Sequence, residues 1–88
     1  MREAADNGLR AEYDTDADAV YGYLSDREYS HGRDLDTGRR IDYAADGSVV
    51  GVELLSPSAG VDLTELPRAA DLAVLLRRLE LRVLQPAG

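Results

Sequence analysis

The fold is decided by residues 39–55, which have the sequence RRIDYAADGSVVGVELL. Apolar and polar residues alternate on both sides of Asp46-Gly47, which is typical of two β-strands with one buried face each. The residues that this alternation turns toward the core are Ile41, Val50, Val52 and Leu54. Because glycine accepts a positive φ, Asp-Gly between two alternating segments predicts a β-hairpin. Gly51 lies inside the second strand and indicates a bulge or a close approach of another backbone.

Two further strands are predicted ahead of this hairpin. Leu9, Ala11 and Tyr13 alternate with polar residues, and residues 19–24 are apolar on both sides. Residues 14–18, with the sequence DTDAD, are turn formers and predict the connection between these strands. A short edge strand is expected near residues 33–35, within a polar stretch. Residues 1–8 are polar and are expected to form a flexible leader.

A helix is predicted behind the sheet. It is expected to begin at Pro67 or Arg68, and one of its faces is apolar. That face contains Ala69, Leu72, Leu75, Leu76 and Leu79. Residues 81–84 favour a last short strand. The predicted fold class is therefore α+β, with an antiparallel sheet of four or five strands covered on one face by a C-terminal helix, in a single domain over residues 9–88.

Composition and charge narrow the function classes. The 88 residues have room for one hydrophobic core and include no cysteine, so disulfides and thiolate metal sites are excluded. A thin core favours a homodimer or another protein partner. The first residues lack an apolar segment, and no apolar run approaches the length that spans a bilayer, so we expect a cytoplasmic protein without membrane contact.

The formal net charge is −7, and all of it comes from residues 1–61, which contain 13 acidic and six basic side chains. Residues 62–88 contain four of each. An acidic surface repels phosphate backbones, so direct nucleic-acid binding is not expected.

No motif predicts a metal or a catalytic centre. Asp14, Asp16 and Asp18 have the spacing of a calcium loop, but the sixth and twelfth positions hold Ala19 and Ser25 where the loop needs Gly and Glu. A tight turn is the better interpretation. His31 is the only imidazole, it follows a serine in a polar loop, and we interpret it as a solvated surface residue. No glycine loop opens a helix to hold phosphate, so no catalytic, cofactor or metal residue is assigned.

The outer face of the sheet is the candidate site. If Ile41 and Val52 face the core, the side chains of Asp42 and Glu53 face away from it on neighbouring strands. Tyr21, Tyr23 and Arg40 are expected on the same face, and Val74 on the exposed side of the helix. One interpretation is a solvated face with weak cross-strand pairs. A second is a surface for a protein partner or for self-association, because Tyr and Arg are enriched at interfaces. A third is an acid–base pair or a small-molecule site formed by Asp42 and Glu53.

The pattern YDTDADAVY at residues 13–21, followed by DYAADGSVVGVELL at residues 42–55, resembles the domain-of-unknown-function family 2283. The resemblance covers about residues 11–60. Gly22 stands where the family has a bulky aliphatic residue, and Ala44 replaces an acidic turn residue. Members of the family have no assigned activity, and some resemble the acidic partner of a small, basic, toxin-like protein. The resemblance therefore implies a non-enzymatic, antitoxin-like interaction module, with an enzyme or small-molecule-binding protein using Asp42 and Glu53 as the alternative.

Overall fold

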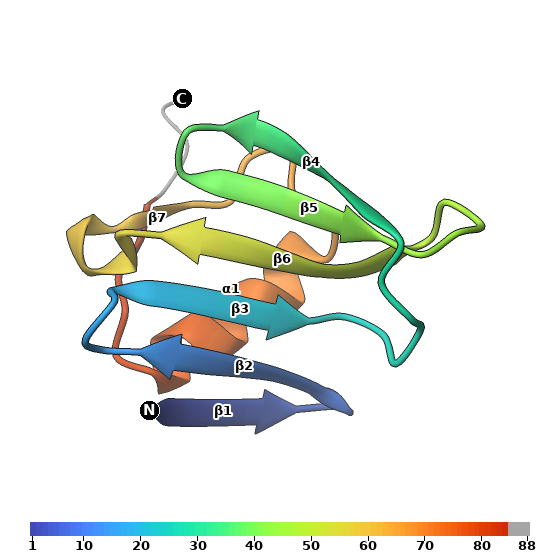
Figure 1. Cartoon of the computed structure of the whole chain (residues 1–88). Helices are drawn as coiled ribbons and strands as arrows, with labels where there is room; N and C mark the ends of the chain where they lie inside the picture. The colour runs from blue at the N-terminus through green and yellow to red at the C-terminus, as the bar shows by residue number, and fades with distance from the viewer. Residues whose placement is uncertain (85–88) are drawn as a thin grey trace.

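The computed structural model describes residues 1–84, in which the main element is a six-stranded antiparallel sheet (Figure 1). The strands lie side by side in the order β1-β2-β3-β6-β5-β4. Their bounds are β1 Arg2–Asp6, β2 Leu9–Asp14, β3 Ala19–Tyr23, β4 His31–Asp36, β5 Arg39–Tyr43 and β6 Val49–Leu55. The predicted hairpin of residues 39–55 forms β5 and β6, with Gly47 at a φ of 87° in the turn.

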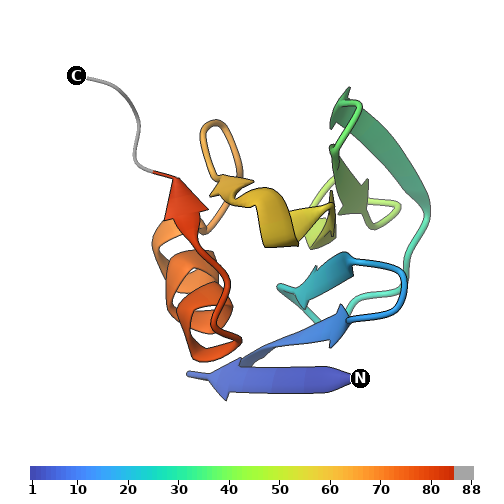
Figure 2. The same ribbon diagram turned by 90° about the vertical axis from the view of Figure 1, so that its left-hand side faces the viewer.

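The second layer consists of the helix α1 (Ala69–Arg78) and two short strands beside it (Figure 2). A 3₁₀ turn, η1 (Pro57–Ala59), leads from the sheet into β7 (Val61–Asp62), and α1 then connects β7 to β8 (Val83–Leu84). β7 and β8 pair in parallel with each other and not with the main sheet. The predicted last strand is therefore confirmed, but it belongs to a small strand–helix–strand unit.

The hydrophobic core lies between the sheet and α1. Leu72, Leu75 and Leu76 of the helix are at most 1% exposed, and they pack with Val20, Val52 and Leu54 of the sheet in one cluster. Gly22 of β3 faces this core, and a Cβ placed on it would lie 2.8 Å from Leu72 Cδ2. The space that a bulky side chain would fill at Gly22 is therefore occupied by Leu72 of the helix, and the family's aliphatic residue is replaced by a neighbour.

The prediction of four or five strands is wrong because residues 1–8 contain a strand. Arg2–Asp6 form β1 at the edge of the sheet and pair with β2 over five consecutive residues. A two-residue turn joins the two strands, with positive φ values of 51° at Asn7 and 80° at Gly8. Ala4 packs against the core. The rest of the strand has polar side chains or the exposed Ala5, so no apolar alternation marks it. The other end of the predicted domain, residues 85–88, lies outside the described residues.

The prediction that Val50 faces the core holds only in part, because its side chain is buried but lies outside the cluster between the sheet and α1. The pairing of β5 with β6 shifts where Tyr43 pairs with Val49 and Asp42 pairs with Gly51, which leaves Val50 as the extra residue of a bulge. A bulge interrupts the alternation of faces. Val49 consequently packs against the core, whereas Val50 is buried outside the core cluster. The bulge predicted from Gly51 is confirmed.

The acidic turn between β2 and β3 is satisfied by hydrogen bonds of its own. Asp14 Oδ1 accepts the backbone N–H groups of Asp16 and Ala17 at 3.0 and 3.1 Å. Asp18 accepts bonds from the hydroxyl groups of Ser58 and Tyr13, which lower its pKa, with the Ser58 bond the larger cause. Over residues 1–84, no three His, Cys, Asp or Glu side chains lie close enough together to hold a metal.

The helix begins one or two residues later than predicted, at Ala69, after Arg68 at a φ of 55°. Within the described part of the chain, no helix is long and apolar enough to cross a membrane.

Candidate functional site

The outer face of the sheet, opposite α1, carries five of the six predicted site residues. Tyr21 on β3 pairs with Glu53 on β6, and Glu53 pairs with Arg40 on β5, so these three side chains form one row across the sheet. Asp42 and Tyr23 lie in the next row along the same strands. The remaining residue, Val74, lies on α1 in the other layer and is half-buried. Val74 is therefore not part of this surface.

Asp42 lies between two glycines. It pairs with Gly51 on one side and with Gly32 of β4 on the other. A Cβ on Gly51 would lie 2.7 Å from Cε2 of the Tyr21 ring, and a Cβ on Gly32 would lie 2.5 Å from Nε of Arg40. The absence of side chains at both positions lets Tyr21 and Arg40 lie flat on the sheet and reach the same carboxylate.

The carboxylate of Asp42 is engaged through both oxygens. The Tyr21 hydroxyl donates to Oδ2 at 2.8 Å, and Arg40 Nε donates to Oδ1 at 3.2 Å. Asp42 is only 9% exposed, so these two bonds compensate most of the cost of burying it. Burial, followed by the bond to Asp42, raises the pKa of Tyr21 well above its usual range. Arg40 also pairs with Asp34 at 3.3 Å and donates to the Tyr29 hydroxyl at 3.3 Å.

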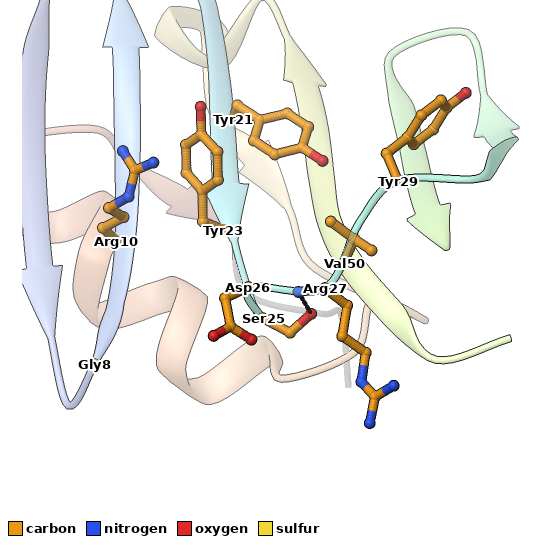
Figure 3. Close-up of a pocket in the computed structure, with 9 residues that line it drawn as sticks. All are labelled: Gly8, Arg10, Tyr21, Tyr23, Ser25, Asp26, Arg27, Tyr29 and Val50. Carbon is orange, nitrogen blue, oxygen red and sulfur yellow. Dashed lines mark hydrogen bonds between the residues drawn. The ribbon is translucent and has the colours of Figure 1, made fainter. Parts of the chain in front are cut away.

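A hollow of about 730 Å³ lies beside this network (Figure 3). Three tyrosine rings form much of its wall, and Val50, turned outward by the bulge, lies between Tyr21 and Tyr29 in the view. Tyr21 and Tyr23 pack edge to face, with ring centroids 4.7 Å apart. The lining residues are Gly8, Arg10, Tyr21, Tyr23, Ser25, Asp26, Arg27, Tyr29 and Val50. We call this hollow the tyrosine groove.

Both cations in the tyrosine groove have acidic partners. Arg10 lies 3.7 Å from the centre of the Tyr23 ring and pairs with Glu12. Arg27 pairs with Asp46 at 2.9 Å. Asp26, in contrast, has no ion-pair partner among residues 1–84. The wall of the tyrosine groove is therefore aromatic, and both of its arginines are paired with acidic residues. Asp26 is its one carboxylate, and it has no ion-pair partner among the described residues.

Sequence reasoning found Tyr21 and Tyr23 but missed the rest of the groove. Asp26, Arg27 and Tyr29 lie in the polar stretch between β3 and β4, where no periodicity indicated a direction for any side chain. Val50 was assigned to the core because the position of the bulge was not apparent. A tyrosine within a polar loop was the available signal, since tyrosine is enriched at binding surfaces.

Neither Asp42 nor Glu53 lines the tyrosine groove, and both oxygens of Asp42 are already engaged by protein donors. His31 is exposed, as predicted, but it is the first residue of β4 and not part of a loop. Its ring stacks on Tyr43 with centroids 5.5 Å apart. The face thus combines rigid aromatic rings with a fixed network of hydrogen bonds, as binding surfaces do.

Fold and site together define a small α+β protein with an aromatic hollow on the open face of an antiparallel sheet. The chain belongs to a family described as Protein of unknown function (DUF2283), whose model matches residues 10–58. This match confirms the resemblance noted over about residues 11–60. It contains β3, β4, β5 and β6 and all of β2 except its first residue, Leu9. No curated protein and no solved structure matches the chain.

Proposed function

We propose that this protein is a non-enzymatic interaction module that binds a basic segment of a partner protein in the tyrosine groove. The observation that carries the proposal is the groove itself, because three tyrosines and Val50 line a hollow that the core does not need. Tyrosine gives a large contact area at a low cost in conformational entropy, and it is enriched among the residues that dominate binding energy.

The preference for a basic partner rests on charge. Residues 1–61, which contain every residue of the groove, carry 13 acidic and six basic side chains. Arg10 and Arg27 are compensated by Glu12 and Asp46, so among the described residues the groove is left with one carboxylate, Asp26, that has no ion-pair partner and can meet an incoming cation. Aromatic faces also attract Arg and Lys side chains. A small basic protein of the kind that antitoxin-like modules cover is consistent with this chemistry, and the surface charge would accelerate its association.

An enzyme that uses Asp42 and Glu53 has no comparable support. A general acid or base must reach the substrate, whereas Asp42 is buried beneath Tyr21 and Arg40 and Glu53 lies outside the groove. The volume of about 730 Å³ is within the range of small-molecule sites, so a small cationic ligand is the second candidate for the same groove.

Short displayed peptides of random sequence, selected on the full chain, provide the probe. We expect selection of basic peptides that bind with measurable heat in calorimetry. Tyr23→Ala and Tyr29→Ala should each weaken the selected peptide at least about tenfold, because an aromatic residue at the centre of an interface contributes more than about 1.4 kcal/mol. Leu84→Ala is the matched control, since Leu84 is an exposed apolar residue of β8 in the other layer.

Two results would contradict the proposal. One is selection of peptides without basic residues, and the other is an affinity that Tyr23→Ala and Tyr29→Ala leave unchanged. If the peptides fail and small cations such as guanidinium compounds shift the NMR signals of Ser25 and Val50 at millimolar concentration or below, the second candidate is favoured.

A further inference from the structure

The two edges of the sheet differ in a way that concerns association. β4 forms one edge and carries a register shift between Asp34 and Asp36, which interrupts its ladder. A bulge on an edge strand opposes pairing with another chain. β1 forms the other edge and pairs with β2 through five residues without a shift. In Figure 1, no element lies beyond β1 on its outer side.

β1 offers backbone groups to a further strand. In an antiparallel ladder, alternate residues bond to the partner strand, and the residues between them point their N–H and C=O groups outward. The two-residue turn closes with Asp6 opposite Leu9, so Arg2, Ala4 and Asp6 bond to β2, and Glu3 and Ala5 point outward. The side chain of Arg78 donates to the Ala5 carbonyl oxygen, which agrees with this direction. A carbonyl oxygen has two lone pairs and can accept a second donor.

The sequence of β1 is complementary to itself when reversed. Its residues are Arg2, Glu3, Ala4, Ala5 and Asp6. An antiparallel copy centred on Ala4 places Arg2 of one copy opposite Asp6 of the other, so each dimer would contain two Arg2–Asp6 contacts. Glu3 then lies opposite Ala5, so both outward-pointing residues of each strand meet their counterparts in register. Opposite charges in cross-strand positions stabilise a ladder, and Ala4 leaves the centre free of steric conflict.

We propose that β1 pairs with β1 of a second copy of this chain and joins two sheets into one continuous sheet across a twofold axis. The partner is a second copy because the charges of β1 match its own reversed sequence. The proposal does not rest on the function proposed for the tyrosine groove, which opens on the face of the sheet and not at this edge. It predicts a dimer in solution that is held by backbone bonds of Glu3 and Ala5 and by Arg2–Asp6 pairs.

Light scattering on a dilution series of the full chain tests the proposal. We expect the mass of a dimer at high concentration. Ala5→Pro removes one of the two outward N–H groups of each strand, that of Ala5, and no bond to β2. It should raise the dissociation constant about thirtyfold, because the dimer loses two neutral hydrogen bonds, one from each copy. An unchanged circular dichroism spectrum and melting curve for Ala5→Pro show that the fold is intact. Tyr23→Ala should leave the mass unchanged.

A charge exchange separates pairing between copies from effects within one copy. Within one copy, Arg2 pairs with Glu80 at 3.3 Å and Asp6 with Arg78 at 3.1 Å. Arg2→Asp and Asp6→Arg should each weaken the dimer, and the double variant R2D/D6R should restore it by recreating the pairs between copies. If the charges acted only within one copy, the double variant would face like charges at Glu80 and Arg78 and would be the weakest. A monomer at all concentrations, a dimer unaffected by Ala5→Pro, or a double variant weaker than both single variants would overturn the proposal.

Discussion

Gly51→Ala tests whether the contact of Tyr21 with Asp42 depends on the absence of a side chain at position 51. A Cβ at this position would lie 2.5 Å from the Gly22 carbonyl oxygen and 2.6 Å from the Tyr21 hydroxyl oxygen. Both distances are shorter than any normal contact, and the first involves the backbone of β3, which moves only if the sheet moves. Overpacking of this kind costs about 1–3 kcal/mol.

A second cost comes from the displaced ring. Tyr21 donates one of the two bonds that compensate the buried carboxylate of Asp42, and the loss of a partner by a buried polar group costs about 1–3 kcal/mol. Because moving the ring relieves part of the overlap, the two costs do not add fully. We expect Gly51→Ala to lower the free energy of unfolding by about 2–4 kcal/mol, which corresponds to about 10–25 °C in melting temperature for a domain of this size.

Urea and thermal unfolding measure this change, and Gly38→Ala is the matched control. A Cβ on Gly38 would meet its nearest atoms at 3.9 Å, an ordinary contact, so this variant should unfold within about 1 kcal/mol of the wild type. A Gly51→Ala variant as stable as Gly38→Ala would refute the reasoning. So would a destabilised variant in which the Tyr21 hydroxyl remains bonded to Asp42 in a crystal structure.

Two further outcomes are expected. Gly22→Ala should lower the free energy of unfolding in urea by about 1 kcal/mol, which is less than the effect of Gly51→Ala. The reason is that the new Cβ would meet the end of the Leu72 side chain and not backbone. An effect equal to or larger than that of Gly51→Ala would contradict this ranking. The raised pKa of Tyr21 means that the folded state holds the phenol proton more tightly than the unfolded state does. The stabilisation that this proton provides is complete below the ordinary tyrosine pKa of about 10, and it is lost as the pH rises above that value. Urea midpoints measured from pH 8 to 12 should therefore fall less steeply for Tyr21→Phe than for the wild type, and parallel curves would count against the assignment.

The elements that could be predicted from the sequence are those with strong local signals. Alternation around Asp46-Gly47 indicated β5 and β6, and the apolar stripe indicated α1. β1 was missed because only Ala4 contributes to the core, although Asn7-Gly8 is itself a strong hairpin signal. That dipeptide, considered together with the strand that follows it, would have suggested a strand on its other side as well.

Site residues were predicted only on strands, where the alternation of faces shows to which side of the sheet each side chain points. Tyr21, Tyr23 and Asp42 were placed on the outer face because their neighbours in sequence face the core. The direction of Val50 depends on a bulge whose position is set by the pairing of Asp42 with Gly51, and pairing between strands is not a local property. Tyr29 approaches Arg40 across 11 positions of sequence, a contact that only the folded loop creates.

The strand order also implies a route by which the chain folds. Within the half formed by β1, β2 and β3, and within the half formed by β4, β5 and β6, each pairing joins strands that are neighbours in sequence, so each half of the sheet can form through short loops. The halves meet where β3 pairs with β6, and there Ala19 lies opposite Leu55, so this step closes a long loop and should limit the folding rate. Tyr23 and Val50 of the tyrosine groove lie on the two sides of that seam. An occupant of the groove would therefore clamp the two halves together and protect the amides along the seam from hydrogen exchange.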